Sequence, residues 1–95
     1  MKYLLNWNDE YLDMQIVSGP LADDAAAREV MKETLIERLV QLGVADDTKD
    51  AEEMYLTAEK AAESEETIGE LRVNACGASI VYNGGYEDRY QIVEH

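Results

Sequence analysis

The sequence has very few of the residues that carry most enzyme chemistry. Its 95 residues include one cysteine, Cys76, and one histidine, His95, which is the last residue. One cysteine cannot form an intramolecular disulfide, and one thiol with one imidazole cannot complete the tetrahedral ligand set of a structural zinc site. Nucleophilic catalysis needs a base within reach of the nucleophile, and no histidine lies near Cys76 in the sequence. We therefore expect a protein that is not an enzyme and that resides in a reducing cytoplasm.

Long apolar runs and phosphate-binding loops are missing as well. No apolar stretch approaches the roughly 20 residues that a membrane-spanning helix needs. The opening residues, MKYLLNWNDEY, hold too few apolar side chains for a signal peptide. Gly84 and Gly85 lack the lysine and hydroxyl residue that complete a P-loop. We therefore expect no membrane association and no bound cofactor.

Acidic side chains are what the sequence has in excess. Eight lysines and arginines stand against 21 aspartates and glutamates, which gives a net charge of -13. This magnitude exceeds the roughly 2 to 8 units that suit a small soluble domain. Nucleic acid and anionic membranes repel such a protein, whereas basic surfaces and cations attract it. The hydrophobic fraction of 46% is that of a folded protein, so we predict a single domain over residues 1–95.

Alternating apolar residues near the start of the chain predict a β-hairpin. Leu12, Met14 and Ile16 alternate with polar residues, which is the period-two pattern of a half-buried strand. Asn8 and Asp9, before this strand, are good turn formers. The preceding strand places three apolar side chains on one face, namely Tyr3, Leu5 and Trp7.

The end of the chain predicts two further strands. One begins at Leu71, is broken or bulged at Gly77 and resumes as ASIVY. Cys76 lies within this run and is expected to be a small buried or half-buried thiol. Asn83-Gly84 is a strong hairpin signal because both residues accept positive φ, and RYQIVE forms the last strand. Tyr82, Tyr86 and Tyr90 around this turn are expected to pair across strands or to form part of a protein interface.

Two helices are predicted between these pairs of strands. The first begins within residues 21–24 and ends at Gly43, a residue suited to the left-handed conformation after a helix. The second is capped by Asp47 or Thr48 and runs to about Ser64. We therefore predict an α+β fold in which a four-stranded antiparallel sheet carries both helices on one face, in the order ββααββ.

The acids concentrate on and around the second predicted helix. From Asp46 to Glu70 there are ten carboxylates and two lysines. Along one face of the helix, the spacings of four, three and four residues align Glu52, Leu56, Glu59 and Glu63. Solvation of a charged helix face is the simplest interpretation, but like charges at these spacings destabilise a helix by a few tenths of a kcal/mol per pair. A second interpretation, a calcium or magnesium site at Asp46, Asp47, Asp50 and Glu53, lacks the twelve-residue loop of a calcium-binding motif.

A line of carboxylates one helical turn apart resembles a line of backbone phosphates in spacing and sign. A protein with a basic groove for nucleic acid is attracted to such a surface by the same field that attracts DNA or RNA. We therefore expect the partner to be a basic nucleic-acid-binding protein, and expect no direct binding to nucleic acid. The predicted partner-binding residues are Asp46, Asp47, Asp50, Glu52, Leu56, Glu59, Glu63 and Glu66.

In size, acidity and its tyrosine-rich terminal hairpin, VYNGGYEDRYQIVEH, the chain resembles small inhibitor proteins of phages and mobile elements. These include the anti-CRISPR and anti-restriction proteins, many of which are acidic and occlude the nucleic-acid channel of a defence enzyme. The resemblance is one of type and rests on no specific motif. It implies an inhibitor that blocks a nucleic-acid-binding defence protein by mimicking DNA.

The alternative is a structural or oligomerisation module whose acidity only keeps it soluble. At helical spacing, one side of the first helix carries the main apolar stripe, namely Ala27, Met31, Leu35, Leu39 and Leu42. Ile36 and Val40 lie away from this stripe and need cover. With the alanine face of the second helix, they form a candidate subunit interface, so a homodimer is left open.

Overall fold

A computed structural model of the chain describes residues 1–63, 71–74 and 76–94, although the side chains of residues 61–63 lie outside that description. Within these residues, five strands and two helices follow one another in the order ββααβββ. The strands are β1 (Lys2–Asn8), β2 (Asp13–Leu21), β3 (Leu71–Asn74), β4 (Gly77–Tyr82) and β5 (Tyr86–Glu94), and the helices are α1 (Asp24–Gln41) and α2 (Thr48–Glu63).

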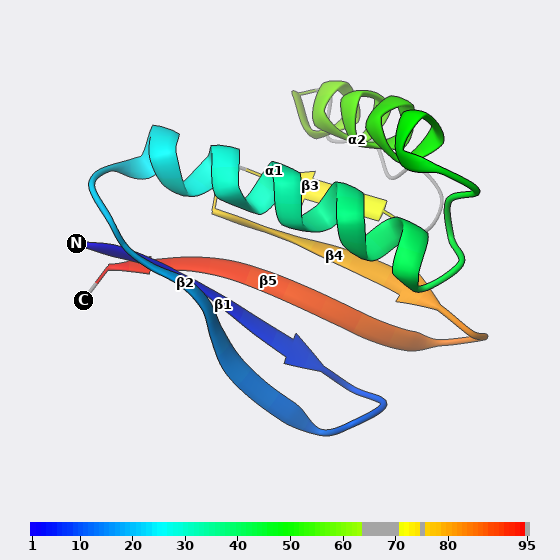
Figure 1. Ribbon diagram of the computed structural model, residues 1–95, viewed down its shortest axis with the longest axis horizontal. Coiled ribbons are helices and arrows are strands. Elements are labelled where there is room, and N and C mark those ends of the chain that lie inside the picture. The colour runs from blue at the N-terminus through cyan, green and yellow to red at the C-terminus, as the bar shows by residue number, and fades with distance from the viewer. Residues whose placement is uncertain (64–70, 75, 95) are drawn as a thin grey trace.

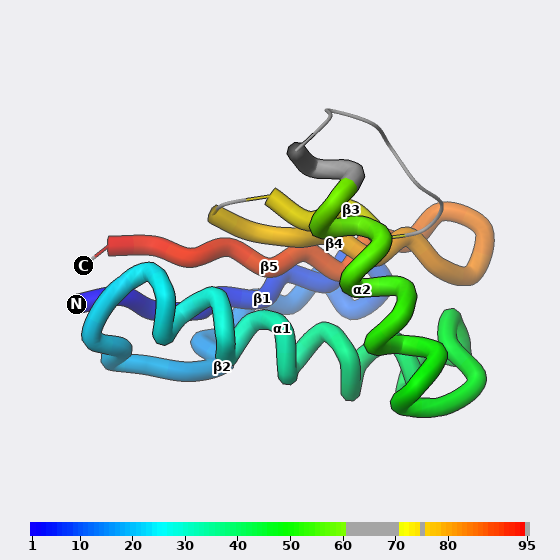
Figure 2. The backbone as a smooth tube through the Cα atoms, turned by 90° about the horizontal axis from the view of Figure 1, so that it is seen from above, coloured from blue at the N-terminus to red at the C-terminus, as the bar shows by residue number. Residues whose placement is uncertain are grey.

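The strands form one antiparallel sheet in the order β2-β1-β5-β4-β3. Helix α1 lies along β1 and β5, and α2 lies over β3 (Figure 1). The two ends of the chain are neighbours in both views because β1 pairs with β5 (Figure 2). The predicted α+β class, with an antiparallel sheet and two helices, is confirmed.

The predicted number of strands was wrong, because the run from Leu71 to Tyr82 is two strands rather than one. Asn74 at the end of β3 pairs with Gly77 at the start of β4, so the chain reverses where a break was expected. The Asn74 side chain accepts a hydrogen bond from the Cys76 N–H at 2.9 Å, which is how asparagine stabilises a turn. A side chain at Gly77 would collide with the carbonyl oxygen of Tyr90, so β4 must begin with glycine.

Both ends of α1 follow local signals in the sequence. At the start, the Asp23 carboxylate accepts the N–H of Ala26 at 2.8 Å. At the end, Gly43 has φ of 76°, and Val44 donates its N–H to the carbonyl of Leu39 at 3.0 Å. This pattern is a Schellman motif, and it confirms the expected stop at Gly43.

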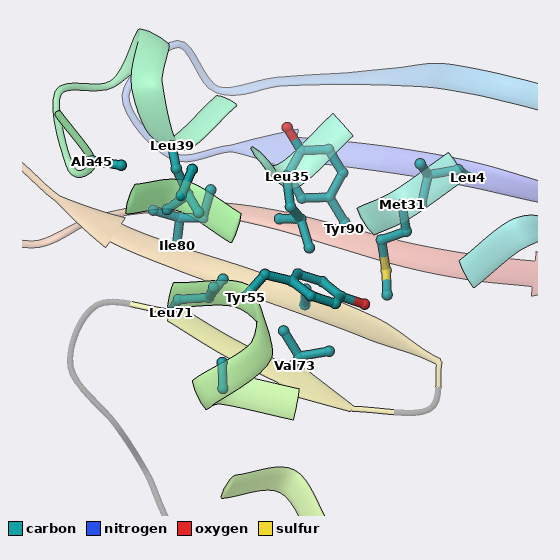
Figure 3. Packing of buried hydrophobic residues seen from close by; sticks show 13 residues of the cluster. Leu4, Met31, Leu35, Leu39, Ala45, Tyr55, Leu71, Val73, Ile80 and Tyr90 are labelled. Atoms are coloured by element: carbon teal, nitrogen blue, oxygen red, sulfur yellow. The ribbon is translucent and has the colours of Figure 1, made fainter. Parts of the chain in front are cut away.

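The core lies between the helices and one face of the sheet (Figure 3). Met31, Leu35 and Leu39 of α1 are fully buried, as the helical spacing predicted. Each fully buried side chain of this size contributes about 1.5 to 3 kcal/mol. They pack in one cluster with residues of α2 and of the strands, including Leu4, Ala51, Tyr55, Ala58, Leu71, Val73, Ile80 and Tyr90.

The predicted half-burial of β2 was wrong. Met14 and Ile16 pair with Trp7 and Leu5, and all four lie on the face of the sheet that the helices do not cover. Met14 is 63% exposed and Ile16 is 65% exposed. A period of two indicates that a strand has two different faces, but it does not say which face meets the helices.

Candidate functional site

Three acids of the predicted partner surface, Asp46, Asp47 and Asp50, lie at the start of α2. The Asp47 carboxylate accepts the N–H of Asp50 at 2.8 Å, which is the bond of an N-cap residue. The Asp50 carboxylate in turn accepts the N–H of Asp46, the residue before the cap, at 3.0 Å. Of the two expected caps, Asp47 and Thr48, the structure shows Asp47, and the carboxylates of Asp47 and Asp50 stabilise the helix start.

The outward face of α2 carries Glu52, Leu56 and Glu59, which we call the acidic ridge. The two glutamates are exposed, and Leu56 is 48% exposed. The opposite face is buried against α1 and β3 through Ala51, Tyr55 and Ala58. The helix is thus two-faced as predicted, and about half of Leu56 is accessible to a partner.

Two predicted members of the surface cannot be placed on it. Glu63 is the last residue of α2, and its side chain lies outside the described part of the structure. Glu66 falls within residues 64–70, which also lie outside it. The surface that the structure brings together therefore consists of the acidic ridge and the capped first turn of α2.

Tyr55 connects the buried face of α2 with the acidic ridge. Burial, followed by the carboxylate of Glu59 and that of Glu29, raises the pKa of Tyr55 to about 12. The Lys32 ammonium lies 5.8 Å from the centre of its ring, within the range of a cation–π contact. The tyrosine therefore stays protonated at neutral pH beside a negatively charged surface.

A shallow cleft separates α1 from the beginning of α2. It has a volume of about 400 Å³ and is lined by Ile36, Val40, Thr48 and Glu52, among others. Ile36 and Val40 are partly buried against the core, so the apolar patch predicted on α1 is covered only in part. The acidic ridge borders this cleft through Glu52.

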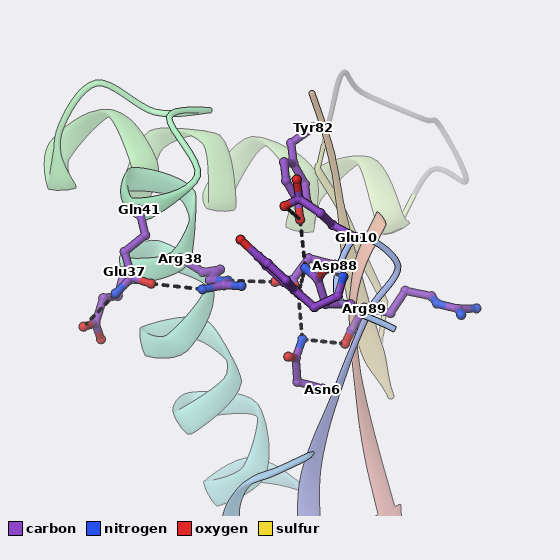
Figure 4. Close-up of polar contacts among 10 residues, drawn as sticks. Asn6, Glu10, Glu37, Arg38, Gln41, Tyr82, Asp88 and Arg89 are labelled. Carbon is purple, nitrogen blue, oxygen red and sulfur yellow. Dashed lines mark hydrogen bonds and ion pairs between the residues drawn. The ribbon is translucent and has the colours of Figure 1, made fainter. Parts of the chain in front are cut away.

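A buried polar cluster lies under the C-terminal half of α1, and the sequence did not predict it (Figure 4). Its centre is Asp88, whose side chain is fully buried. One carboxylate oxygen accepts hydrogen bonds from Asn6 at 2.9 Å and Asn8 at 3.0 Å. The other accepts one from the Arg38 guanidinium at 3.1 Å. Among the described residues, the buried side-chain polar atoms all have hydrogen-bond partners.

Two tyrosines close this cluster. The Tyr82 hydroxyl accepts a hydrogen bond from Asn8 at 2.9 Å and donates one to Glu10 at 3.1 Å. Burial and then the charge of Asp88 raise the pKa of Tyr90, and burial also raises the pKa of Tyr82. Tyr82 further packs against Tyr86 across the hairpin, with ring centres 5.9 Å apart, so cross-strand pairing is confirmed for these two tyrosines. Tyr90 instead lies opposite Ala78 and Asn6. The cluster ties three strands to α1 and fixes the fold.

In the sequence, the positions of Asn6 and Asn8 are the feature that could have predicted this cluster. They follow Leu4 at a spacing of two, so they point to the same face of β1 as a core residue. Buried asparagines require hydrogen-bond partners. The partner Asp88 lies 82 residues from Asn6, a distance over which the sequence pattern carries no pairing information.

The face of the sheet opposite the helices holds a hollow with a volume of about 720 Å³. Trp7 and Met14 lie at one side of it, and Arg72 and Arg89 lie toward the other strands. The Trp7 indole N–H donates to Asp9 at 2.6 Å, and the Arg89 guanidinium lies 3.9 Å from the same carboxylate. This face is therefore ordered, mixed in chemistry and poor in acids.

Cys76 also borders this hollow, and its expected burial was wrong. The residue is exposed, because the turn that separates β3 from β4 carries it to the surface. Within the described part of the chain, no three His, Cys, Asp or Glu side chains are grouped so that they could hold a metal ion. Asp46, Asp47, Asp50 and Glu53 are accordingly not grouped in this way.

Comparisons with known proteins assign no family. No family model matches the chain. No curated protein and no solved structure matches it either. None of the described helices is long and apolar enough to span a membrane. The function must be argued from the surfaces themselves.

Proposed function

We propose that this protein is a small acidic inhibitor that binds a basic nucleic-acid-binding protein through the acidic ridge. It occupies the partner's groove for DNA or RNA and so prevents nucleic acid from binding there, in the manner of an anti-CRISPR or anti-restriction protein. The observation that carries the proposal is the exposed row of Glu52, Leu56 and Glu59 on a helix whose other face is anchored in the core.

Anchoring matters because a rigid surface loses less entropy on binding than a mobile one. Ala51, Tyr55 and Ala58 hold α2 against α1 and β3, and the bonds of the Asp47 and Asp50 carboxylates hold its first turn. Glu52 and Glu59 therefore keep a fixed separation of about two helical turns, ~10.5 Å along the axis, with Leu56 between them. The groove of the partner meets two carboxylates at a fixed distance.

The charge of the rest of the molecule adds long-range attraction. Further exposed carboxylates on the two helices are Asp24, Glu29, Glu33, Glu37 and Glu53. A net charge of -13 steers a basic partner toward the molecule from a distance and raises the association rate. Leu56 then supplies an apolar contact inside the acidic surround. The net charge thus speeds association, and Leu56 gives the complex a defined point of contact.

The test is displacement of proteins from immobilised nucleic acid. A bacterial lysate is bound to DNA-loaded and RNA-loaded resins, and the purified protein is added to release those proteins whose nucleic-acid site it occupies. We expect the wild-type protein to release a defined basic protein. We expect the variant E52K/E59K to release it at least about tenfold less well, because attraction at two contacts becomes repulsion.

The matched control is D13K/E53K, which changes the net charge by the same amount. Glu53 lies on α2 outside the acidic ridge, and Asp13 lies at the start of β2. If release depends only on net charge, the control and the ridge variant lose activity equally, and the ridge has no special role. We also expect the wild-type protein to release its partner less well at moderate salt than at low salt.

A further inference from the structure

The open face of the sheet is a second surface with unusual chemistry. In a sheet that is covered on one side only, the uncovered side is normally polar. Here the register instead places a row of mixed side chains across five strands: Met14, Trp7, Arg89, Ser79 and Arg72. The neighbouring row begins with Ile16 and Leu5. We use the name open face for these residues together with Tyr3, Asn74, Val81, Glu87, Gln91 and Val93.

The apolar part of the open face lies on β1 and β2, at the edge of the sheet. Met14 and Ile16 are 63% and 65% exposed, and Trp7 and Leu5 beside them are half-buried. This apolar patch continues across two strands and is therefore larger than a single exposed side chain. Contiguous exposed apolar patches of this kind mark interaction sites on soluble proteins.

The charges of the molecule are divided between its two sides. Among the described residues, the charged side chains that the strand register places on the open face are Arg72, Arg89 and Glu87. The carboxylate of Asp9, from the turn after β1, also lies beside Trp7 and Arg89. The exposed acids of α1 and α2 lie in the other layer. A sheet and its helix layer are separated by about 10 Å, so the open face is the side on which self-repulsion of this chain is weakest.

We propose that the open face binds the open face of a second copy of this chain, forming a symmetric dimer. Two sheets packed face to face bring the apolar patches together and leave both helix layers, with their acids, on the outside. Contact through the helix layers would instead bring the acids of the two copies together. Glu87 beside Arg89 gives the face charges of both signs, which a two-fold interface can pair with each other.

The size of the open face suits this partner. Five strands about 4.8 Å apart give a face on the order of 500 Å², so two faces together reach the ~1,000 Å² that a specific interface needs. A basic protein is drawn to α2 instead, and nucleic acid is repelled by the net charge. The dimer inference does not depend on the proposed inhibition, and it would make the inhibitor bivalent because each copy displays its own acidic ridge.

The test is the molecular mass in solution by sedimentation equilibrium over about a hundredfold range of concentration. We expect the wild type to pass from monomer to dimer, and to do so more readily at higher salt, which screens the repulsion between acidic chains. Binding of the acidic ridge to a basic protein should instead weaken as the salt concentration rises. A result that contradicts the dimer therefore leaves the proposed inhibition untouched, and the reverse also holds.

The decisive variants are M14K/I16K and its controls. Lysine at these exposed positions makes the chain less acidic, so repulsion between whole molecules falls while the apolar patch is destroyed. We expect the double variant to remain monomeric over the whole range. Ile16→Lys alone should weaken the dimer at least about tenfold, whereas Leu56→Lys, with the same charge change, should leave it unchanged.

Trp7 provides a second readout because it is the only tryptophan. We expect quenching of its fluorescence by acrylamide to fall as the protein concentration rises, and expect no such change in M14K/I16K. The far-ultraviolet circular dichroism of each variant checks that the fold is intact. A wild type that stays monomeric, or a dimer that persists in folded M14K/I16K, overturns the proposal.

Discussion

Carboxylates occur in two very different settings in this molecule, the buried cluster around Asp88 and the exposed acidic ridge of α2. Asp88 has no exposed surface and is bonded by Arg38, Asn6 and Asn8. The ridge carboxylates of Glu52 and Glu59 face water. The same chemical group therefore fixes the fold in one place and is free to meet a partner in the other. Burial and partners, rather than the number of acids, decide which role a carboxylate has.

The largest expected effect comes from removing the buried carboxylate. Asp88→Ala should lower the free energy of unfolding by about 3 kcal/mol or more, because it leaves the guanidinium of Arg38 and two buried amides without their acceptor. Urea unfolding at neutral pH measures the change. Asp88→Asn should cost less, since one acceptor oxygen remains. If Asp88→Ala were no more harmful than Glu52→Ala, the contrast between the two settings would be lost.

Stability at alkaline pH tests Tyr55, which is buried but lies beside the exposed acids of the ridge. Tyr55 ionises at about pH 10 when unfolded, and its pKa is raised to about 12 in the fold by burial and by the acids beside it. The folded state therefore holds this proton longer than the unfolded state, so the stabilisation is complete below pH 10 and is lost as the pH rises toward 12. Tyr90 and Tyr82, with raised pKa values, act in the same direction.

We expect unfolding titrations to show falling stability over this alkaline range, and expect Tyr55→Phe to show a smaller fall than the wild type. Tyr11, which is exposed, offers the matched control Tyr11→Phe. Equal pH profiles for the wild type and Tyr55→Phe would show that Tyr55 does not contribute.

A smaller effect is expected at the start of α2. Asp47→Ala should lower the free energy of unfolding by about 1 kcal/mol, because the N–H of Asp50 loses its acceptor. Asp47→Ser should restore most of this loss, since serine also caps helices. Partner release by Asp47→Ser should remain near the wild-type level if capping is the main role of Asp47, and should fall if its charge is needed for binding.

The smallest effect is expected on the ridge itself. Glu52→Gln should change the free energy of unfolding by less than about 0.5 kcal/mol, because Glu52 is exposed and its carboxylate makes no hydrogen bond or ion pair with the described residues. Urea unfolding measures the change. A loss as large as that of Asp47→Ala would mean that Glu52 has a structural partner, which would bring it closer to Asp88 in character.

Features set by neighbouring residues were predictable from the sequence. The first hairpin, the start of α1 within residues 21–24, the stop at Gly43 and the two faces of α2 all arise from contacts within a few residues. The reversal before Gly77 was missed because its turn is stabilised by a side chain, that of Asn74, where glycine suggested only a bulge. Alternation within β2 was recognised, but its orientation depends on the register with β1.

Features that join distant parts of the chain were not predictable. The bonds from Asn6 and Asn8 to Asp88 span 82 and 80 residues. The open face likewise exists only because β5 lies between β1 and β4. The acidic ridge was predicted from helical spacing alone, and its exposed residues are where that spacing placed them.

The most direct measurement is photo-crosslinking from two positions, with benzoylphenylalanine in place of Leu56 or of Ile16, in a bacterial lysate. We predict that the probe at Leu56 captures a basic nucleic-acid-binding protein, that added DNA or RNA suppresses this adduct, and that the probe at Ile16 captures a second copy of the chain. An adduct at Leu56 that is indifferent to nucleic acid, or no protein adduct there at all, would contradict the central claim that the acidic ridge occupies a nucleic-acid site.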